Sequence, residues 1–293
     1  MRHPPTAPRG RRKTVQDFTT GDGVRLAYRD SGGEGTPLLM LHGWGQTQEM
    51  FRHQFEEFSA GRRVVTVDLR GHGRSAKPHH GYRIARLSRD VLELVEHLGL
   101  SAFDALGWSM GASVWWSFID QYGTDHIRRL VIVDQPAAVA AVPWMTEAEQ
   151  RESGAIFDVT GLLDLGAALA GPDGRRARQE FVRSMFTGDT TDAALLAFVA
   201  EEIESTPAYA GVPLLFDHCA QDWRDVLPRI DRPTLVLGCE GSHVDPHSQR
   251  YIAARIPAAE LHVFPRESAA SHFPFLENPD EFNTVLEKFL TRP

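Results

Sequence analysis

The sequence has little cysteine and no long apolar run. Only two of its 293 residues are cysteine, Cys219 and Cys239, which is too few for a disulfide framework and favours a reducing compartment, here the cytoplasm. No uninterrupted apolar stretch reaches the roughly 18 residues that a membrane-spanning helix needs. The sequence therefore predicts a protein without a membrane partner.

An excess of positive charge is also missing. The chain carries 31 Lys and Arg against 39 Asp and Glu, a formal net charge of −8, so a nucleic-acid partner is not expected. Basic residues and prolines gather in residues 1–13. They predict a disordered basic arm and not an export signal, because no apolar segment of about 7–15 residues follows the paired arginines.

The rest of the sequence alternates between two kinds of segment. Short apolar runs bounded by Gly, Asp or Pro are typical of strands buried on both faces, and segments of helical periodicity lie between them. This alternation predicts an α/β fold in which helices cover both faces of a mostly parallel sheet. The predicted strands are residues 24–28, 37–41, 64–67, 103–106, 130–133, 234–237 and 260–264. The predicted helices are residues 83–98, 111–122, 247–255 and 280–290.

Residues 137–226 interrupt the alternation, because they contain helical pieces and turn signals but no strand-like run. They predict a helical cap inserted between two parts of a core domain, residues 14–136 and 227–293. Aromatic residues of the cap form its own core or line a pocket beneath it. These aromatic residues are Trp144, Phe157, Phe181, Phe186, Phe198 and Tyr209.

A G-x-S-x-G motif carries the main chemical signal. It reads Gly107-Trp108-Ser109-Met110-Gly111 and lies between a predicted strand and a predicted helix. A sharp strand-to-helix turn exposes the central serine above the sheet, and glycine avoids backbone clashes on either side. The helix N-terminus favours negative charge there, so Ser109 is the candidate nucleophile.

The strand at residues 37–41 ends in His42-Gly43-Trp44. A backbone N–H just past this strand can face the nucleophile, and with the N–H that follows the serine it would form an oxyanion hole. This assigns the backbone N–H groups of Trp44 and Met110. We interpret His42 as a brace for the loop, and the glycine-rich turn at residues 68–75 as scaffold.

These motifs and a late histidine resemble those of the α/β-hydrolase superfamily over nearly the whole chain, about residues 20–290. The elbow and the segment Ser271-His272-Phe273-Pro274-Phe275-Leu276-Glu277-Asn278-Pro279 resemble the cofactor-free (non-haem) chloroperoxidase-like group of esterases and lactonases. The resemblance implies an eight-stranded sheet, a cap after the sixth strand, and a Ser–His–acid triad.

The resemblance places the catalytic histidine in a loop after the last strand, and of the thirteen histidines His272 fits this position. The other candidates are His262, inside that strand, and His243 and His247, near the preceding one. A nucleophilic serine without a base would be inert.

The acid departs from the family pattern. Its usual position, four residues before Pro246, holds the uncharged Ser242. Asp134, which ends the preceding sheet strand, is the favoured replacement, because some members of the superfamily place the acid there and a triad is defined by geometry. Glu240 and Asp245 flank the empty position and stay alternatives. Asp134 also has a purely structural interpretation as the cap of a turn.

Together these residues predict a serine hydrolase that cleaves an ester or lactone of an apolar or aromatic small molecule. Trp108, Trp144 and Phe273 are the predicted substrate contacts, and Trp108 has a second interpretation as packing behind the elbow.

No metal or nucleotide cofactor is expected, because no H-E-x-x-H, G-x-G-x-x-G or Walker motif is present. The alternatives are a cofactor-free oxygenase, a perhydrolase or haloperoxidase, and a non-enzymatic ligand receptor. The oligomeric state is not predicted.

Overall fold

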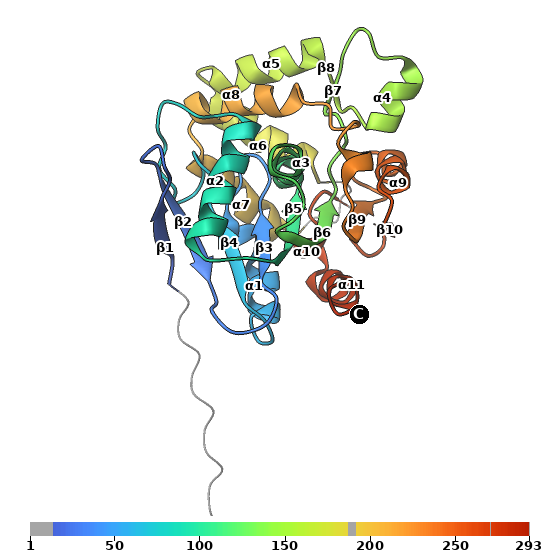
Figure 1. Ribbon diagram of the computed structural model, residues 1–293. Coiled ribbons are helices and arrows are strands. Elements are labelled where there is room, and N and C mark those ends of the chain that lie inside the picture. The colour runs from blue at the N-terminus through green and yellow to red at the C-terminus, as the bar shows by residue number, and fades with distance from the viewer. Residues whose placement is uncertain (1–13, 187–191, 270, 293) are drawn as a thin grey trace, which may run out of the picture.

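A computed structural model describes residues 14–186, 192–269 and 271–292 (Figure 1). The predicted arm, residues 1–13, lies outside this part of the chain. One eight-stranded sheet has the order β1-β2-β4-β3-β5-β6-β9-β10. Its first two pairings are antiparallel and the others parallel, which confirms the predicted fold class. The strands are β1 (Gln16–Thr19), β2 (Arg25–Asp30), β3 (Leu38–Leu41), β4 (Val64–Val67), β5 (Phe103–Trp108), β6 (Ile127–Val133), β9 (Thr234–Cys239) and β10 (Ala259–Phe264).

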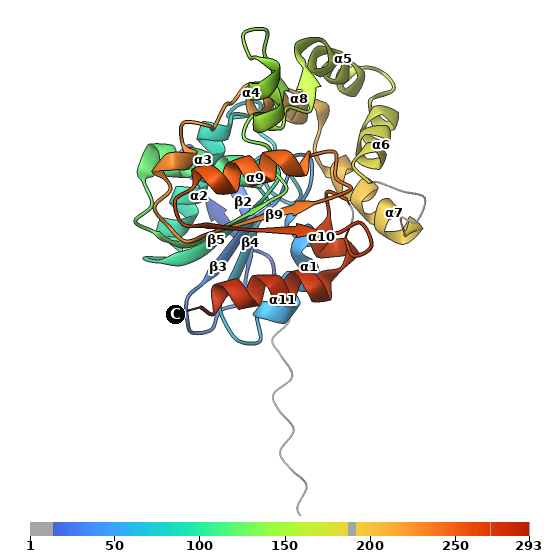
Figure 2. The same ribbon diagram turned by 90° about the vertical axis from the view of Figure 1, so that its right-hand side faces the viewer.

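Helices cover both faces of the sheet, with α2, α3 and α9 on one face and α1 and α11 on the other (Figure 2). The fully buried β3, β4 and β5 form the centre of the core between them. The core helices are α1 (Arg52–Phe58), α2 (Ile84–His97), α3 (Met110–Tyr122), α9 (Pro246–Arg255), α10 (Pro274–Glu277) and α11 (Pro279–Leu290), with 3-10 turns η1 (Gln48–Phe51) and η3 (Leu227–Arg229).

The edge strand β1 and the short helix α1 are absent from the sequence prediction. β1 buries only Phe18 of its four residues, so the alternation that identifies a strand is missing. In contrast, α2 buries apolar residues at helical spacing and ends before Gly99, whose φ of +63° suits a helix C-terminus.

The segment between β6 and β9 lies over the carboxyl ends of the central strands (Figures 1 and 2). The prediction of no strand here is wrong in one detail, because β7 and β8 form a two-residue parallel ladder, too short to leave a periodic signal. The elements of this segment are β7 (Ala140–Ala141), α4 (Glu147–Ser153), β8 (Phe157–Asp158), α5 (Val159–Ala170), α6 (Gly174–Ser184), α7 (Ala193–Glu202), η2 (Ile203–Ser205) and α8 (Ala208–Cys219).

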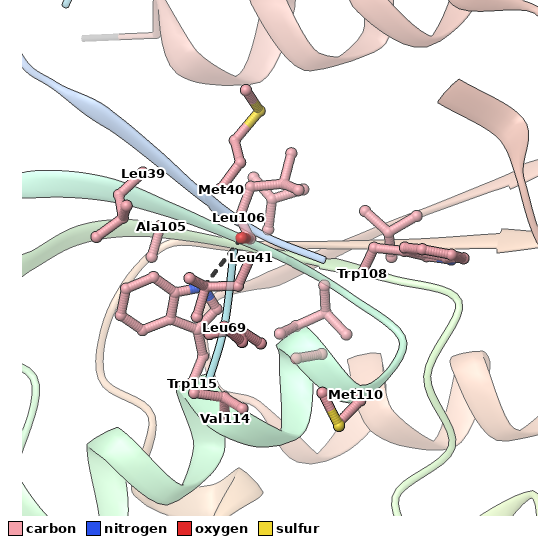
Figure 3. Close-up of a cluster of buried hydrophobic side chains, with 14 of the residues drawn as sticks. Leu39, Met40, Leu41, Leu69, Ala105, Leu106, Trp108, Met110, Val114 and Trp115 are labelled. Carbon is pink, nitrogen blue, oxygen red and sulfur yellow. Dashed lines mark hydrogen bonds between the residues drawn. The ribbon is translucent and has the colours of Figure 1, made fainter. Parts of the chain in front are cut away.

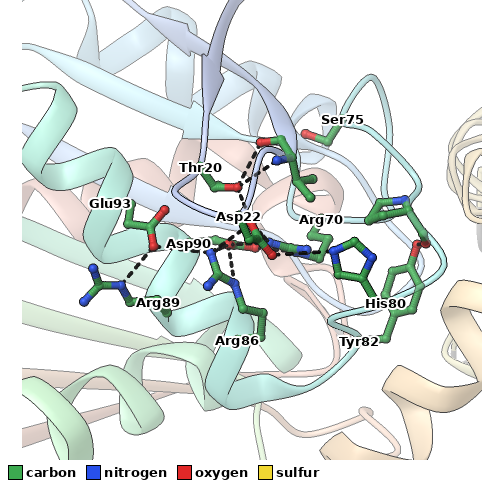
Figure 4. Close-up of polar contacts among 12 residues, drawn as sticks. Thr20, Asp22, Arg70, Ser75, His80, Tyr82, Arg86, Arg89, Asp90 and Glu93 are labelled. Atoms are coloured by element: carbon green, nitrogen blue, oxygen red, sulfur yellow. Dashed lines mark hydrogen bonds and ion pairs between the residues drawn. The ribbon is translucent and has the colours of Figure 1, made fainter.

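A buried ion-pair group, here called the Arg70 cluster, joins three segments of the core (Figure 4). Arg70 follows β4 and is fully buried, and its guanidinium lies 2.8 Å from Asp90 on α2 and 2.8 Å from Asp22 in the β1–β2 turn. Arg86 on α2 pairs with the same two carboxylates and with Glu93. The cluster comprises these five residues and fixes α2 against the sheet edge.

Candidate active site

Ser109 occupies a strained turn between β5 and α3. Its φ is +53°, a conformation that costs a non-glycine residue on the order of 1–3 kcal/mol. A Cβ at Gly111 would lie 2.1 Å from the carbonyl oxygen of Leu41, and one at Gly107 would lie 2.6 Å from the amide nitrogen of Ala112. Only glycine therefore fits two positions before and two positions after this serine.

The second strained residue is Asp134, which directly follows β6. Among the described residues, Ser109 and Asp134 are the two non-glycine positions with positive φ, and Asp134 has a φ of +48°. Such strain persists where the surrounding structure enforces it, and it gathers at functional sites.

His272, in the loop between β10 and α10, contacts the second of these strained positions. Its Nδ1 lies 2.7 Å from Oδ2 of Asp134. Ser242 donates a hydrogen bond of 2.5 Å to the same oxygen. The residue at the family's usual acid position thus holds the Asp134 carboxylate, which comes from the neighbouring strand.

The other candidate acids and bases lie elsewhere. Glu240 and Asp245 are both exposed, and Asp245 accepts a hydrogen bond from the backbone N–H of His247 at the start of α9. His247 is exposed, and His262 lies within β10. Within the described part of the chain, none of these four residues contacts Asp134 or His272, whereas the His243 ring lies 4.5 Å from the His272 ring.

Burial sets the electrostatics of the His272–Asp134 pair. Both side chains are nearly inaccessible to water, and removal from water disfavours charge on each. Desolvation therefore lowers the pKa of His272 and raises the pKa of Asp134. Because the two groups share a hydrogen bond, they titrate as a unit, and the imidazole is uncharged at neutral pH.

The oxyanion-hole candidates lie close to Ser109. Met110 begins α3, and Trp44 lies in the turn after β3. Neither backbone N–H donates a hydrogen bond to another described residue. Two buried histidines brace the adjoining loops: His42 Nε2 accepts from the N–H of Leu69, and His72 Nε2 accepts from the N–H of Gly45.

Ser109 and His272 line one cavity of about 40 Å³ beneath the cap. The core wall also includes Trp44, Gln46, Trp108, Gln135, Pro136 and His243. The cap side includes Val139, Ile156, Phe157, Phe181, Leu215 and His218. A drug-sized ligand commonly occupies several hundred Å³, so the described conformation is a closed one.

The predicted substrate contacts need two corrections. Trp144 has 80% of its surface exposed and does not line this cavity, because it lies in the turn before α4. Phe273 is fully buried behind the cavity, with its ring 4.4 Å from Phe186 and 5.3 Å from Trp108. Trp108 combines both of its interpretations, since it lines the cavity and packs behind the elbow.

Two cap phenylalanines, Phe157 and Phe181, are the only predicted cap aromatics that line the cavity within the described residues. Sequence analysis missed His218 and Cys219 at the end of α8. Both residues lie on the buried side of α8, and this was the available signal. Nothing in the sequence indicates, however, which part of the fold this side of the helix faces.

In the described ranges, no group of three or more His, Cys, Asp or Glu side chains is arranged to hold a metal ion. The helices of the same ranges are all too short or too polar to span a lipid bilayer.

Comparisons with known proteins agree with this fold. A family model described as the alpha/beta hydrolase fold matches residues 36–279. A non-heme chloroperoxidase of Kitasatospora aureofaciens is 27% identical over 284 residues, covering 94% of this chain and 98% of the relative. A bromoperoxidase from Bacillus anthracis superposes with a TM-score of 0.85 at 22% identity, covering 95% of this chain and 100% of that one. An esterase from Rhodococcus sp. superposes with a TM-score of 0.79 at 25% identity, covering 94% and 98%. The chain therefore belongs to the alpha/beta hydrolase family, and within it is similar to the non-heme chloroperoxidases.

Proposed function

We propose that the protein is a serine hydrolase that cleaves an ester or lactone of an uncharged, largely apolar small molecule. One observation carries this proposal: Ser109, on its strained turn, opens into the same closed cavity as a buried histidine bonded to Asp134. A nucleophile, a base and a residue that orients the base are the three parts that activate a serine.

The reaction proceeds through an acyl-enzyme. The Ser109 hydroxyl attacks the carbonyl carbon while His272 takes its proton, and the protonated imidazole then gives that proton to the leaving alcohol. Asp134 holds the imidazole in the tautomer that leaves Nε2 free to act. Water, activated by the same histidine, releases the acid and restores Ser109.

The backbone N–H groups of Trp44 and Met110 stabilise the oxyanion of the tetrahedral intermediate. One such donor contributes about 2.7–4 kcal/mol in known hydrolases. The Trp44 indole also donates a 2.8 Å hydrogen bond to the carbonyl of Gly211 on α8. The cap and the oxyanion loop are thus connected, and a cap movement that admits substrate also acts on this loop.

A second candidate is perhydrolysis, favoured by the likeness to a non-heme chloroperoxidase. Hydrogen peroxide would replace water and attack the same acyl-enzyme, giving a peracid and free Ser109. The peracid then oxidises a halide ion in solution and returns to the carboxylic acid. This reaction uses the same residues and needs no metal or haem in any step.

The test is hydrolysis of p-nitrophenyl esters and aromatic lactones by the wild type and by Ser109→Ala, together with labelling by a fluorophosphonate probe. We expect Ser109→Ala to lose turnover by several orders of magnitude and to lose all labelling. Glu240→Gln is the matched control, because its carboxylate is exposed and its loss should leave both signals intact.

Adding hydrogen peroxide and bromide separates the two candidates. Peracid formation that also requires Ser109 assigns the perhydrolase activity to the acyl-enzyme. If Ser109→Ala turns over every substrate as the wild type does, the serine hydrolase proposal is wrong. Oxygen uptake with the His272–Asp134 pair as base would then be measured, and a chain that neither labels nor turns over any substrate would be a ligand receptor.

A further inference from the structure

The cavity beneath the cap has walls without formal charge. None of the residues that line it is Lys, Arg, Asp or Glu, and its polar side chains are amides, imidazoles, a thiol and the Ser109 hydroxyl. A carboxylate or ammonium group on a ligand would lose its water here without an opposite charge to replace it. The cavity therefore selects against charged substrates.

His218 is one of the polar side chains on these walls that have no role in the proposed triad. His218 comes from the last turn of α8 in the cap, and only 5% of its surface is exposed. Its Nδ1 is buried and has no hydrogen-bond partner among the described residues. A buried polar atom in a folded protein normally has a partner, and each exception needs an explanation.

The remaining neighbours of His218 in the cavity do not provide that partner. Leu215 and Met185 are apolar, and burial raises the pKa of the Cys219 thiol to about 12, so this thiol stays neutral. Desolvation lowers the pKa of His218 to about 3. The imidazole is thus neutral at pH 7 and offers one donor and one acceptor.

His243, on the core side of the same cavity, repeats this pattern. Its Nδ1 is also buried without a partner in the described ranges, and desolvation lowers its pKa to about 3. Its ring faces that of His272, at 4.5 Å. Two neutral imidazoles on opposing elements, the cap and the loop after β9, therefore offer hydrogen bonds to whatever fills the space near the triad.

We infer that His218 is a specificity-determining residue, which binds an uncharged polar group, such as a ketone, amide or hydroxyl, on the substrate away from its scissile carbonyl. The inference rests on the proposed ester hydrolysis and narrows its substrate class. The substrate is a neutral ester or lactone with a second hydrogen-bonding group, and a plain hydrocarbon ester is a poor substrate because it leaves the buried imidazole unpaired.

Matched esters test this inference. We would measure kcat/KM for p-nitrophenyl hexanoate, its 4-oxo and 5-oxo derivatives, and the carboxylate-bearing mono-p-nitrophenyl glutarate, each divided by its rate with hydroxide alone. Pentyl acetate and 4-oxopentyl acetate place the ketone on the alcohol side. The variants are His218→Phe, which keeps an aromatic ring without polar atoms, and His218→Gln, which restores a donor and an acceptor.

In the wild type, we expect at least one oxo ester to exceed its hydrocarbon match by about tenfold or more, and the glutarate to be the poorest acyl substrate. His218→Phe should bring the oxo-to-hydrocarbon ratio close to 1, and His218→Gln should restore part of it. Met185→Leu is the matched control, because it changes another cavity wall without removing a hydrogen bond and should keep the wild-type ratio.

A ratio that is the same in the wild type and His218→Phe for every pair overturns the inference, and so does glutarate turnover equal to that of hexanoate. Tryptophan fluorescence of Ser109→Ala with the same esters measures binding without hydrolysis. A His218-dependent preference in binding, without Ser109-dependent turnover of any ester, would overturn the proposed function and keep the subsite. Ser109-dependent turnover without a His218-dependent preference would support the proposed function and overturn the subsite.

Discussion

The Arg70 cluster and the cavity beneath the cap both remove polar side chains from water, but they do so in opposite ways. In the Arg70 cluster, each buried charge has an opposite charge within hydrogen-bond distance, as between Arg70 and Asp90 at 2.8 Å. Behind the cavity wall, a single carboxylate, Asp134, is held by a histidine and a hydroxyl. His218 and His243 each leave one nitrogen without a partner in the described chain.

The difference separates a structural device from a reactive one. The Arg70 cluster pairs each charge with an opposite one and fixes a helix, although Nη1 of Arg70 has no hydrogen-bond partner among the described residues. The cavity instead combines unpaired polar atoms with backbone strain at the two residues of the proposed triad that carry it. Substitutions in the cavity should therefore change activity more than stability, and substitutions in the cluster should do the opposite.

The largest expected effect is on the acid. Asp134→Asn keeps the shape of the side chain but removes the charge that orients and stabilises the imidazole, so kcat should fall by about 10⁴-fold. The free energy of unfolding, measured by urea denaturation, should change far less than for a lost buried ion pair. Asp245→Asn is the control, because this exposed helix cap does not contact His272.

A second substitution sharpens this prediction. Ser242 already contacts Asp134 Oδ2 from the family's usual acid position. Combining Asp134→Asn with Ser242→Asp should recover at least tenfold of the lost kcat by placing a carboxylate on that side. An unchanged kcat for Asp134→Asn alone would contradict the triad assignment.

The next largest effect concerns stability. Arg70→Met leaves Asp90 buried without its main partner, which typically costs about 3–5 kcal/mol. Arg89→Ala, on the same helix, removes the half-exposed partner of Glu93 and should cost no more than about 1 kcal/mol. Urea denaturation measures both losses, and kcat of folded Arg70→Met should stay within a few-fold of the wild type. If both variants lost the same free energy of unfolding, the buried Arg70–Asp90 pair would stabilise the fold no more than the half-exposed Arg89–Glu93 pair.

Acid should destabilise the protein through its buried histidines. Desolvation lowers the pKa of His218 and of His72 to about 3, below the value of about 6.5 in an unfolded chain. The unfolded state therefore binds more protons than the native state between about pH 6.5 and pH 3. Stability is complete above this window and falls within it, by up to about 1.4 kcal/mol per histidine and pH unit.

Asp134, with its pKa raised to about 7, contributes the opposite slope, and so do Asp90, Asp104 and Glu202, whose pKa values burial also raises. They are fewer than the buried histidines of lowered pKa, which are His42, His72, His218, His243 and His272. The pKa of Asp22 in the Arg70 cluster is lowered by its hydrogen bond to Arg70. Asp22 therefore stays ionised and paired with Arg70 at a pH that is low enough to protonate the buried histidines. His72→Gln should flatten the dependence of the unfolding free energy on pH between 4 and 6. The same slope in this variant and the wild type would show that His72 is protonated in the folded state.

The elbow and most of the sheet could be predicted because their signals are local. The elbow motif is contained in five consecutive residues, and the clash at Gly107 is with the nearby backbone of Gly111 and Ala112, although the clash at Gly111 is with Leu41 of β3. Strands buried on both faces appear as continuous apolar runs. The polar edge strand β1 carries no such signal, because its pairing with β2 and not its side chains defines it.

The acid and the pocket depend on contacts across long stretches of chain. Asp134 lies 138 positions from His272, and only the parallel pairing of β6 with β9 brings it beside Ser242. Trp144 was expected in the pocket because it is aromatic and lies in the cap, but its orientation follows from how the turn before α4 packs. Residue type alone does not determine on which side of a cap a side chain lies.

The smallest effect tests how the elbow positions the histidine. The indole N–H of Trp108 donates a 2.8 Å hydrogen bond to the carbonyl oxygen of His272. Trp108→Phe retains a ring against Phe273 and Phe275 and removes this bond. A lost hydrogen bond of this kind is worth about 1 kcal/mol, so kcat should fall about fivefold while KM changes little.

Trp115→Phe is the matched control for this positioning role. The Trp115 indole lies beneath the same elbow and donates a 3.0 Å hydrogen bond to the carbonyl oxygen of Leu106 (Figure 3). Both substitutions remove one buried indole-to-carbonyl bond, so both should lower the unfolding free energy by about 1 kcal/mol. Only Trp108→Phe should lower kcat, because only its bond ends on the histidine. If both variants lost kcat equally, packing beneath the elbow, and not the position of His272, would limit the reaction.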